Sequence, residues 1–340
     1  METKKKNGKF YLALVIFSLV GQVAWVVENM YLNVFIYKMF QATPEAISAM
    51  VAASAVAATV TTLLIGALSD KVGKRKLFIC GGYILWGISI WSFAVIRLDV
   101  INALFPAVAS AASLGVTLVI VMDCVMTFFG SSANDACFNA WLTDSTNDTN
   151  RGLAEGINAM MPLVAILAVF GGFMGVNQDL ADSWTLIFAP AIILAAVFTG
   201  LYGQVYDKKG FRTAIVLPMV LLMAGYVILY LTRHTVPVFI GSVLMMCGFL
   251  GTGAILGAKV RTHTPENRSG MFQGLRIVGQ VLIPGVVGPY IGKMILQNAQ
   301  MITNSDGTQS FLPNANIFLG ALVAIAFAWV VMIPLMKKEK

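Results

Sequence analysis

The stretch GALSDKVGKRK, from Gly66 to Lys76, carries five charges in its last seven residues and lies between long apolar runs. A second stretch, GQVYDKKGFRT from Gly203 to Thr213, repeats Gly, Asp, Lys, Gly and Arg at the same offsets. Each stretch joins two apolar segments close to the roughly 20 residues that a helix needs to cross a bilayer. Two such loops in one chain indicate a duplicated membrane protein.

The composition agrees with a membrane location. Hydrophobic residues make up 58% of the 340 residues and charged residues only 11%, against roughly 25% charged in soluble domains. Backbone polar groups in lipid must be paired within their own segment, so the apolar runs become helices. The sequence therefore predicts an all-α, multi-pass membrane protein.

The sequence lacks the residues that several functional classes of protein need. The four cysteines fall inside apolar runs without metal-ligand spacing, and no phosphate-binding loop, zinc motif or nucleophile elbow is present. The net charge of +7 comes from residues grouped in alternate loops rather than in a nucleic-acid-binding patch. We expect no enzyme, no metal, no cofactor and no nucleic-acid partner.

Hydropathy and charge together predict the topology. About ten spans are expected, near residues 10–38, 46–68, 77–96, 114–140, 153–176, 185–203, 213–232, 236–258, 270–296 and 316–336. With both termini in the cytoplasm, eighteen Lys and Arg residues lie in cytoplasmic segments and four outside, with Arg276 inside a span. This bias is what the positive-inside rule requires, and it predicts a multi-pass protein of the cell membrane.

A second repeat supports the duplication. Asn150-Arg151-Gly152 leads into the fifth span, and Asn267-Arg268-Ser269-Gly270 leads into the ninth. Each of these arginine loops comes two spans after its copy of the acidic-basic loop. The predicted domains are an N-terminal bundle over residues 1–184 and a C-terminal bundle over residues 185–340, with five spans each.

These loops carry a family resemblance. Gly66, Asp70, Gly73 and Arg75 resemble the loop between the second and third helices of the major facilitator superfamily, with Lys74 where that family usually has Arg. The arginine loop resembles the family's second cytoplasmic motif. Within the family, NDACFNAWLTD (Asn134–Asp144) and RGLAEG (Arg151–Gly156) are similar to bacterial sugar-type carriers.

The resemblance implies an architecture of two helix bundles, with about ten helices instead of the family's twelve. Aligning the two loops places both missing helices within Ala181 to Phe198, which predicts an internal deletion. It also implies a cytoplasmic latch at the loops, with gating residues Gly66, Asp70, Gly73, Arg75, Asp207, Arg212, Arg151 and Arg268.

Polar residues in the first span gather on one helical face. At about 100° per residue, Glu28 shares that face with Trp25, Asn29 and Asn33. Ionisable side chains at membrane depth are costly and mark ion or substrate pathways. Glu28 is therefore a candidate ion-coupling residue and its three neighbours are candidate substrate contacts. The alternative is a glutamate that reaches the outer interface by snorkelling.

The fourth span carries a longer polar stripe of Asp123, Thr127, Ser131, Asn134 and Asp135, within about 120° of one another. A carrier coupled to protons needs a carboxylate that changes its charge, so Asp123 and Asp135 are candidate coupling residues and Asn134 a substrate contact. The alternatives are a permanent bond to a neighbouring helix for Asp123 and a structural pairing with Arg151 or the Asp70 loop for Asp135.

The ninth span places Gln273, Arg276, Gln280 and Pro284 within about 80°. Arg276 and Gln280 are candidate substrate contacts, since the guanidinium offers a planar set of donors. Pairing of Arg276 with a carboxylate, or snorkelling to the cytoplasmic surface, are the other interpretations.

The leading functional hypothesis is a secondary transporter that moves a small polar solute, a sugar or related metabolite, by symport with H⁺ or Na⁺ through alternating access. Proton-driven efflux of drugs or metabolites is the nearest alternative. A hypothesis from another class is a truncated paralogue that binds or regulates without transport. A shortened bundle would expose polar stripes to membrane lipid, which predicts a homodimer.

Overall fold

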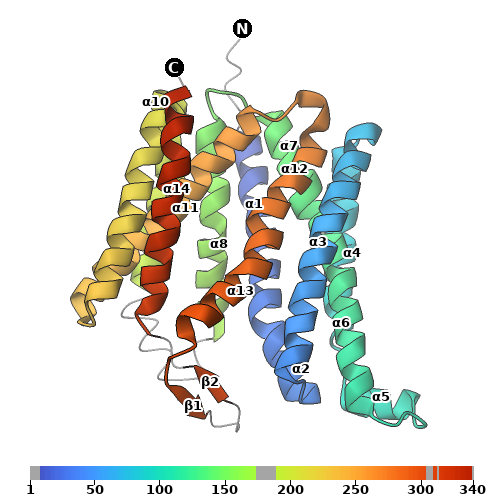
Figure 1. Ribbon diagram of the computed structural model, residues 1–340. Helices are drawn as coiled ribbons and strands as arrows, with labels where there is room; N and C mark the ends of the chain where they lie inside the picture. Colours follow the sequence, from blue (N-terminus) through green and yellow to red (C-terminus); the bar gives the residue numbers. More distant parts are fainter. Residues whose placement is uncertain (1–7, 174–188, 304–308, 312–313, 339–340) are drawn as a thin grey trace. The chain divides into compact units, whose positions relative to one another are not determined.

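The computed structural model describes residues 8–173, 189–303, 309–311 and 314–338 and is almost entirely helical (Figure 1). The chain divides into two compact units, each made of segments that are distant in the sequence. One unit, called unit 1 below, contains residues 1–19, 146–263 and 288–340. The other, unit 2, contains residues 20–145 and 264–287.

Unit 2 holds most of the first four spans and the first part of the ninth. The first span is continuous but changes geometry, and its first twelve residues belong to unit 1. The elements of unit 2 in chain order are the last eight residues of α1 (Gly8–Val27), then η1 (Glu28–Leu32), α2 (Asn33–Phe40), α3 (Pro44–Val72), α4 (Arg75–Ser92), α5 (Leu98–Leu104), α6 (Ala111–Gly130), η2 (Ser131–Phe138), α7 (Asn139–Ser145), η5 (Glu266–Arg268), α12 (Ser269–Ile277) and η6 (Val278–Leu282).

Unit 1 holds the remaining spans. Its elements are α8 (Arg151–Phe173), α10 (Ala189–Leu231), α11 (Thr235–Thr262), α13 (Ile283–Leu296), β1 (Met301–Thr303), β2 (Gln309–Phe311) and α14 (Asn316–Lys338), with the start of α13 in unit 2. The two strands form a short antiparallel hairpin, with Met301 opposite Phe311, which the sequence did not predict. The start of α1 and the end of α14 lie at the same end of Figure 1.

Helix boundaries follow local chemistry. α3 begins after Thr43, whose hydroxyl oxygen accepts the backbone N–H of Ala46 at 3.3 Å, and Pro44 occupies the first helical position. The helix ends at Gly73, whose φ of 69° is left-handed and favours glycine. Gly210 is the matching residue of the second loop, with φ of 73°, and it interrupts α10. Both glycines take a positive φ that favours glycine, but their ψ angles of 6° and 175° differ, so the two breaks have different backbone geometry.

The span count agrees with the expected architecture. Eight helices of the described residues are long and apolar enough to cross a membrane. One of them, Ile193–Leu231, contains the break at Gly210 and so corresponds to two predicted spans. The third predicted span is α4, whose 18 residues start with Arg75 and Lys76. The all-α membrane fold is confirmed.

Each unit has its own apolar core. In unit 2, Ile36, Val119 and Trp86 are almost fully buried where α2, α6 and α4 meet. In unit 1, Ile215 and Ile255 are fully buried between α10 and α11, and α14 packs on the same cluster. The two units are defined by which segments lie close together, whereas the predicted bundles are defined by the sequence repeat. The predicted domain boundary between residues 184 and 185 therefore stays a prediction.

The predicted deletion lies partly outside the described residues. Of the stretch from Ala181 to Phe198, the structure describes only the part from Ala189 onward, which is the start of α10. The deletion therefore stays a prediction.

Candidate functional site

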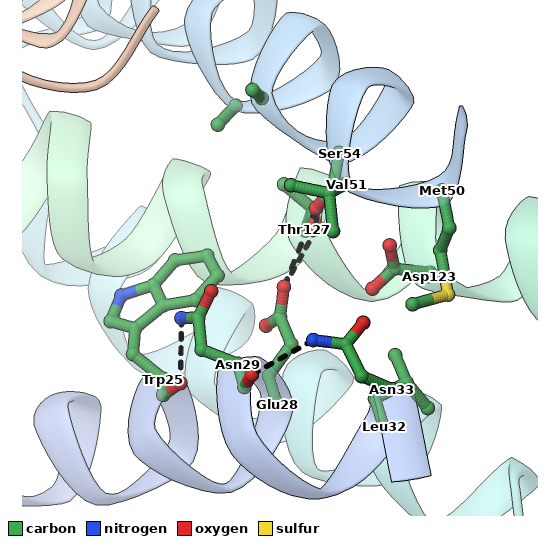
Figure 2. A pocket seen from close by; sticks show the side chains of 12 residues that line it. Trp25, Glu28, Asn29, Leu32, Asn33, Met50, Val51, Ser54, Asp123 and Thr127 are labelled. Atoms are coloured by element: carbon green, nitrogen blue, oxygen red, sulfur yellow. Dashed lines mark hydrogen bonds between the residues drawn. The ribbon is translucent and has the colours of Figure 1, made fainter. Parts of the chain in front are cut away.

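A polar cavity of about 120 Å³ lies within unit 2, between the first span, α3 and α6 (Figure 2). Five predicted site residues line it, and the structure brings them together from two spans. The lining residues are Trp25, Glu28, Asn29, Leu32, Asn33, Met50, Val51, Ser54, Ala55, Ala58, Asp123 and Thr127.

The two carboxylates of this cavity are buried. Asp123 is 2% exposed and Glu28 is 9% exposed. One oxygen of Glu28, Oε1, lies 3.4 Å from the hydroxyl of Ser54 and 3.4 Å from that of Thr127. Those two hydroxyls share a hydrogen bond of 2.7 Å with each other. Figure 2 shows the carboxylate of Glu28 pointing from its helix toward this hydroxyl pair.

The asparagines of the cavity use their donors locally. The amide Nδ2 of Asn29 donates to the carbonyl oxygen of Trp25 at 2.8 Å, and that of Asn33 donates to the carbonyl oxygen of Asn29 at 3.1 Å. Each bond uses one of the two N–H donors of its amide, so each side chain keeps its acceptor oxygen and a second N–H for a bound molecule.

Three acceptor atoms in this cavity are buried without a hydrogen-bond partner among the described residues. They are Oε2 of Glu28, Oδ1 of Asn33 and Oδ1 of Asp123. Buried polar atoms in proteins are nearly always satisfied, so each such atom calls for a ligand, a water or an ion. A donor-bearing solute or a cation would satisfy all three.

The helix geometry changes beside the site. Glu28–Leu32 and Ser131–Phe138 are π-helical, and so is Val278–Leu282 in the ninth span. π-helical segments are rare and are found frequently at functional sites. These three segments contain the predicted site residues Glu28, Asn134 and Gln280, respectively.

The rest of the fourth-span stripe lies in a second polar group of unit 2. The hydroxyl of Tyr83 donates to Oδ1 of the buried Asn134 at 3.0 Å, and Nδ2 of Asn134 donates to Asp135 at 3.3 Å. Asp135 also accepts from the hydroxyl of Ser131 at 2.9 Å. Asn134 and Asp135 do not line the cavity that holds Glu28 and Asp123.

Arg276 and Gln280 are joined to each other. The Nε–H of Arg276 donates to Oε1 of Gln280 at 2.9 Å, and an Nη1–H donates to Oδ1 of Asn139 at 3.3 Å. Neither residue lines the cavity. The roles predicted for Arg276, Gln280, Asn134 and Asp135 stay predictions.

The first loop forms a polar latch in unit 2. The carboxylate of Asp70 accepts the backbone N–H groups of Gly270 and Met271 at 2.9 and 3.0 Å, at the start of α12. Arg75 binds Asp70 at 2.7 Å, and its Nε–H binds Asp144. Gly66 packs directly on the backbone of Gly270.

The second loop repeats this arrangement in unit 1. The carboxylate of Asp207 accepts the backbone N–H groups of Gly152 and Leu153 at 2.6 and 2.8 Å, at the start of α8. Gly203 packs on the backbone of Gly152. Each acidic-basic loop therefore caps the arginine-loop helix of the other sequence half.

The remaining predicted loop residues differ between the two latches. Arg151 donates to the carbonyl oxygen of Thr146 at 2.9 Å and lies 3.3 Å from Asp148. Arg212 and Arg268 have exposed side chains. Gly73 supplies the left-handed turn that ends α3.

Two polar pairs near the latches were not predicted from the sequence. In unit 1, Arg261 is 1% exposed and its Nε–H donates to the carboxylate of Glu155. In unit 2, Nε2 of Gln273 donates to the hydroxyl of Thr143 at 3.3 Å. Glu155 lies three residues after Gly152, as Gln273 does after Gly270, so the repeat itself could have revealed both pairs.

A many-pass helical protein with buried, unpaired carboxylates facing a polar cavity has the features of a membrane carrier. The chain belongs to the Major Facilitator Superfamily, because the model of that family matches residues 11–198. No curated protein sequence matches the chain.

Among solved structures, the chain is similar to the major facilitator superfamily proton:xylose symporter XylE bound to 6-bromo-6-deoxy-D-glucose. The TM-score is 0.64 at 11% sequence identity, and the match covers 95% of this chain and 96% of the other. At this identity the likeness shows the fold.

Proposed function

We propose that this protein is a secondary active transporter that moves a small polar solute, a sugar or related metabolite, together with H⁺ or Na⁺. The observation that carries the proposal is the set of three unpaired acceptor oxygens on Glu28, Asn33 and Asp123 around one cavity. A solute rich in hydroxyl groups supplies the donors that these oxygens lack.

Glu28 and Asp123 are the proposed coupling carboxylates. In a buried site a carboxylate is costly when charged and unpaired, so binding of a cation or a proton removes that cost. Alternating access would then be tied to loading of both carboxylates, since an unloaded site keeps two uncompensated charges. Trp25, Asn29 and Asn33 are the proposed solute contacts, with Trp25 as an apolar wall.

The latches at the two loops are proposed to stabilise one of the two access states. Each latch joins a loop of one sequence half to a helix start of the other half. Rocking of the halves would have to break these bonds, which is a gating role. Both termini in the cytoplasm, the cell membrane as location and a homodimer complete the proposal.

Two transport assays in proteoliposomes test the coupling. Gradient-driven uptake needs both solute binding and ion coupling, whereas exchange of labelled for unlabelled solute needs no net ion movement. We expect Asp123→Asn to abolish gradient-driven uptake and to retain exchange. Undiminished gradient-driven uptake in Asp123→Asn would remove that residue from the coupling mechanism.

A further inference from the structure

A cavity of about 460 Å³ lies within unit 1, where the end of α10, the first half of α11 and the start of α14 meet. Figure 1 shows the turn between α10 and α11 and the start of α14 at the end of this unit opposite the C-terminus. Most of the lining is apolar, and Leu229, Met245 and Phe318 contribute to it from the three helices. The cavity has the size of sites that enclose small organic ligands.

The polar residues of this cavity lie mostly at the helix ends. Thr232 and Arg233 follow α10, and Asn314 precedes α14. Ser242 lies seven residues beyond Thr235, where α11 begins, which is about 10 Å along the helix. The cavity therefore has polar groups near the helix ends and an apolar interior with one hydroxyl.

Arg233 has one side of its guanidinium group occupied and the other side free. Its Nη1 donates to carbonyl oxygens at the end of α10, those of Leu229, Tyr230 and Thr232, at 3.0, 3.2 and 2.6 Å. Its Nε and Nη2 donors have no hydrogen-bond partner among the described residues. The bonds to the helix end hold the group in place, and the Nε–Nη2 edge offers the two parallel donors that bind a phosphate.

Ser242 is the second group of this cavity that lacks a partner. The residue is 8% exposed, and its hydroxyl has no hydrogen-bond partner in the part of the chain that the structure describes. Buried hydroxyls are nearly always satisfied, so this one calls for a polar atom inside the cavity. The ester carbonyls of a phospholipid, which join its acyl chains to the glycerol phosphate, are suitable acceptors.

The surroundings of the cavity favour an occupant from the bilayer. Leu231, Val236 and Ile240 are exposed apolar side chains close in sequence to lining residues of α10 and α11. Exposed apolar surface of this kind marks contact with a membrane. A free phosphate would leave the apolar walls without a partner, and an uncharged lipid would leave the guanidinium edge without one. An anionic phospholipid satisfies both.

We propose that this cavity binds one anionic phospholipid, with its phosphate on the free edge of Arg233 and one acyl chain between α10, α11 and α14. Ser242 donates to an ester carbonyl of the same lipid. The site shares no residue with the proposed solute cavity, which lies in unit 2.

The test is photolabelling of the purified full chain in phosphatidylcholine nanodiscs that contain a small fraction of phosphatidylglycerol with a diazirine in one acyl chain. Labelled peptides are located by mass spectrometry. We expect label on α11 between Val238 and Met246, and at least a ten-fold reduction of this label by excess unlabelled phosphatidylglycerol. Glycerol phosphate, which has no acyl chains, should not compete. Equal labelling by a diazirine phosphatidylcholine, or equal competition by glycerol phosphate, would overturn the proposal.

Variants locate the headgroup and the chain. Arg233→Gln should lower the labelling of this segment at least five-fold, and Arg233→Lys, which keeps the charge, should lower it less. Arg97→Gln is the matched control and should label like the wild type, because Arg97 is an exposed arginine at a helix start that does not line the cavity.

Ser242→Leu fills the cavity and should also lower the labelling at least five-fold. Val238→Phe fills it from another position if leucine at position 242 prevents folding. Equal labelling of Arg233→Gln and Arg97→Gln, or full labelling of a folded cavity-filling variant, would contradict the proposed site. The assay uses no gradient and no solute, so its result does not depend on the proposed transport.

Discussion

At the scale of single residues, two aspartates make the same capping interaction in two places. Asp70 and Asp207 each accept two backbone N–H groups at a helix start. A carboxylate in this position satisfies donors that the helix leaves unpaired and interacts favourably with its positive end. The repeat in the sequence is therefore a repeat of the same interaction.

Replacing either aspartate should destabilise the protein. We expect Asp70→Ala and Asp207→Ala each to lower the free energy of unfolding by about 1–3 kcal/mol, since two backbone donors lose their acceptor. Asn at either position should cost less, because its amide oxygen still accepts. Denaturant unfolding in detergent measures the effect. The exposed Arg212 supplies the control, with Arg212→Ala expected within about 0.5 kcal/mol of the wild type. Equal stability of the alanine variants and this control would contradict the capping role.

Five of the nine residues predicted for ion coupling and substrate binding line one cavity. Glu28, Asn29 and Asn33 share a face at helical spacing, and Asp123 faces them from α6. Ser54 was missed because the serines and threonines of this alanine-rich span are spread over more than one helical face and give no periodic signal. Asn134 and Asp135 were expected on the same face as Asp123, but the π-helical segment from Ser131 changes the rotation per residue on which that expectation depends.

At the scale of elements, the close contacts of helices depend on glycine. A Cβ added at Gly66 would overlap the carbonyl oxygen of Gly270, and one at Gly203 would overlap that of Gly152. Neither carbonyl can move away easily, because both belong to helix backbone. Small residues at such positions allow membrane helices to approach closely.

Gly66→Ala and Gly203→Ala should therefore separate the helix pairs α3–α12 and α10–α8. We expect each to lower the free energy of unfolding by about 1–3 kcal/mol. The control is Gly81→Ala in α4, where an added Cβ meets nothing within 4 Å. A loss of stability in Gly81→Ala as large as in Gly66→Ala would show that helix propensity or expression, and not packing, explains the effect.

The buried pair of Glu155 and Arg261 joins α8 to α11, and the neutral pair of Gln273 and Thr143 has the same place in the repeat. Removing one partner of a buried ion pair leaves an uncompensated charge and costs about 3–5 kcal/mol. We expect Glu155→Gln and Arg261→Thr to be strongly destabilising when made singly.

The double variant Glu155→Gln/Arg261→Thr copies the neutral pair and removes both charges. It should recover most of the stability lost in the single variants. The coupling energy, measured from unfolding of the wild type, the two single variants and the double variant, should therefore be large and favourable. Strictly additive losses in the double variant would show that the two side chains do not depend on each other.

At the scale of the whole molecule, the fold was predictable because the bilayer restricts it. Apolar runs of membrane length must be helical, and the charges of the loops set their order across the membrane. The hairpin of β1 and β2 was not predictable, since its strands are three residues each and lack a strong alternating pattern. The break at Gly210 was expected, because the sequence repeats there the glycine of the first loop, Gly73.

The central claim is that the cavity around Glu28 and Asp123 couples solute movement to a cation gradient. Substrate-induced current on a solid-supported membrane measures this directly, because cotransport of a neutral solute with a cation moves charge. We predict a transient current from at least one small polar solute for the wild type, and none from Glu28→Gln or Asp123→Asn with intact folding. Folded wild-type protein that gives no current with any sugar, polyol or related metabolite tested would contradict the account.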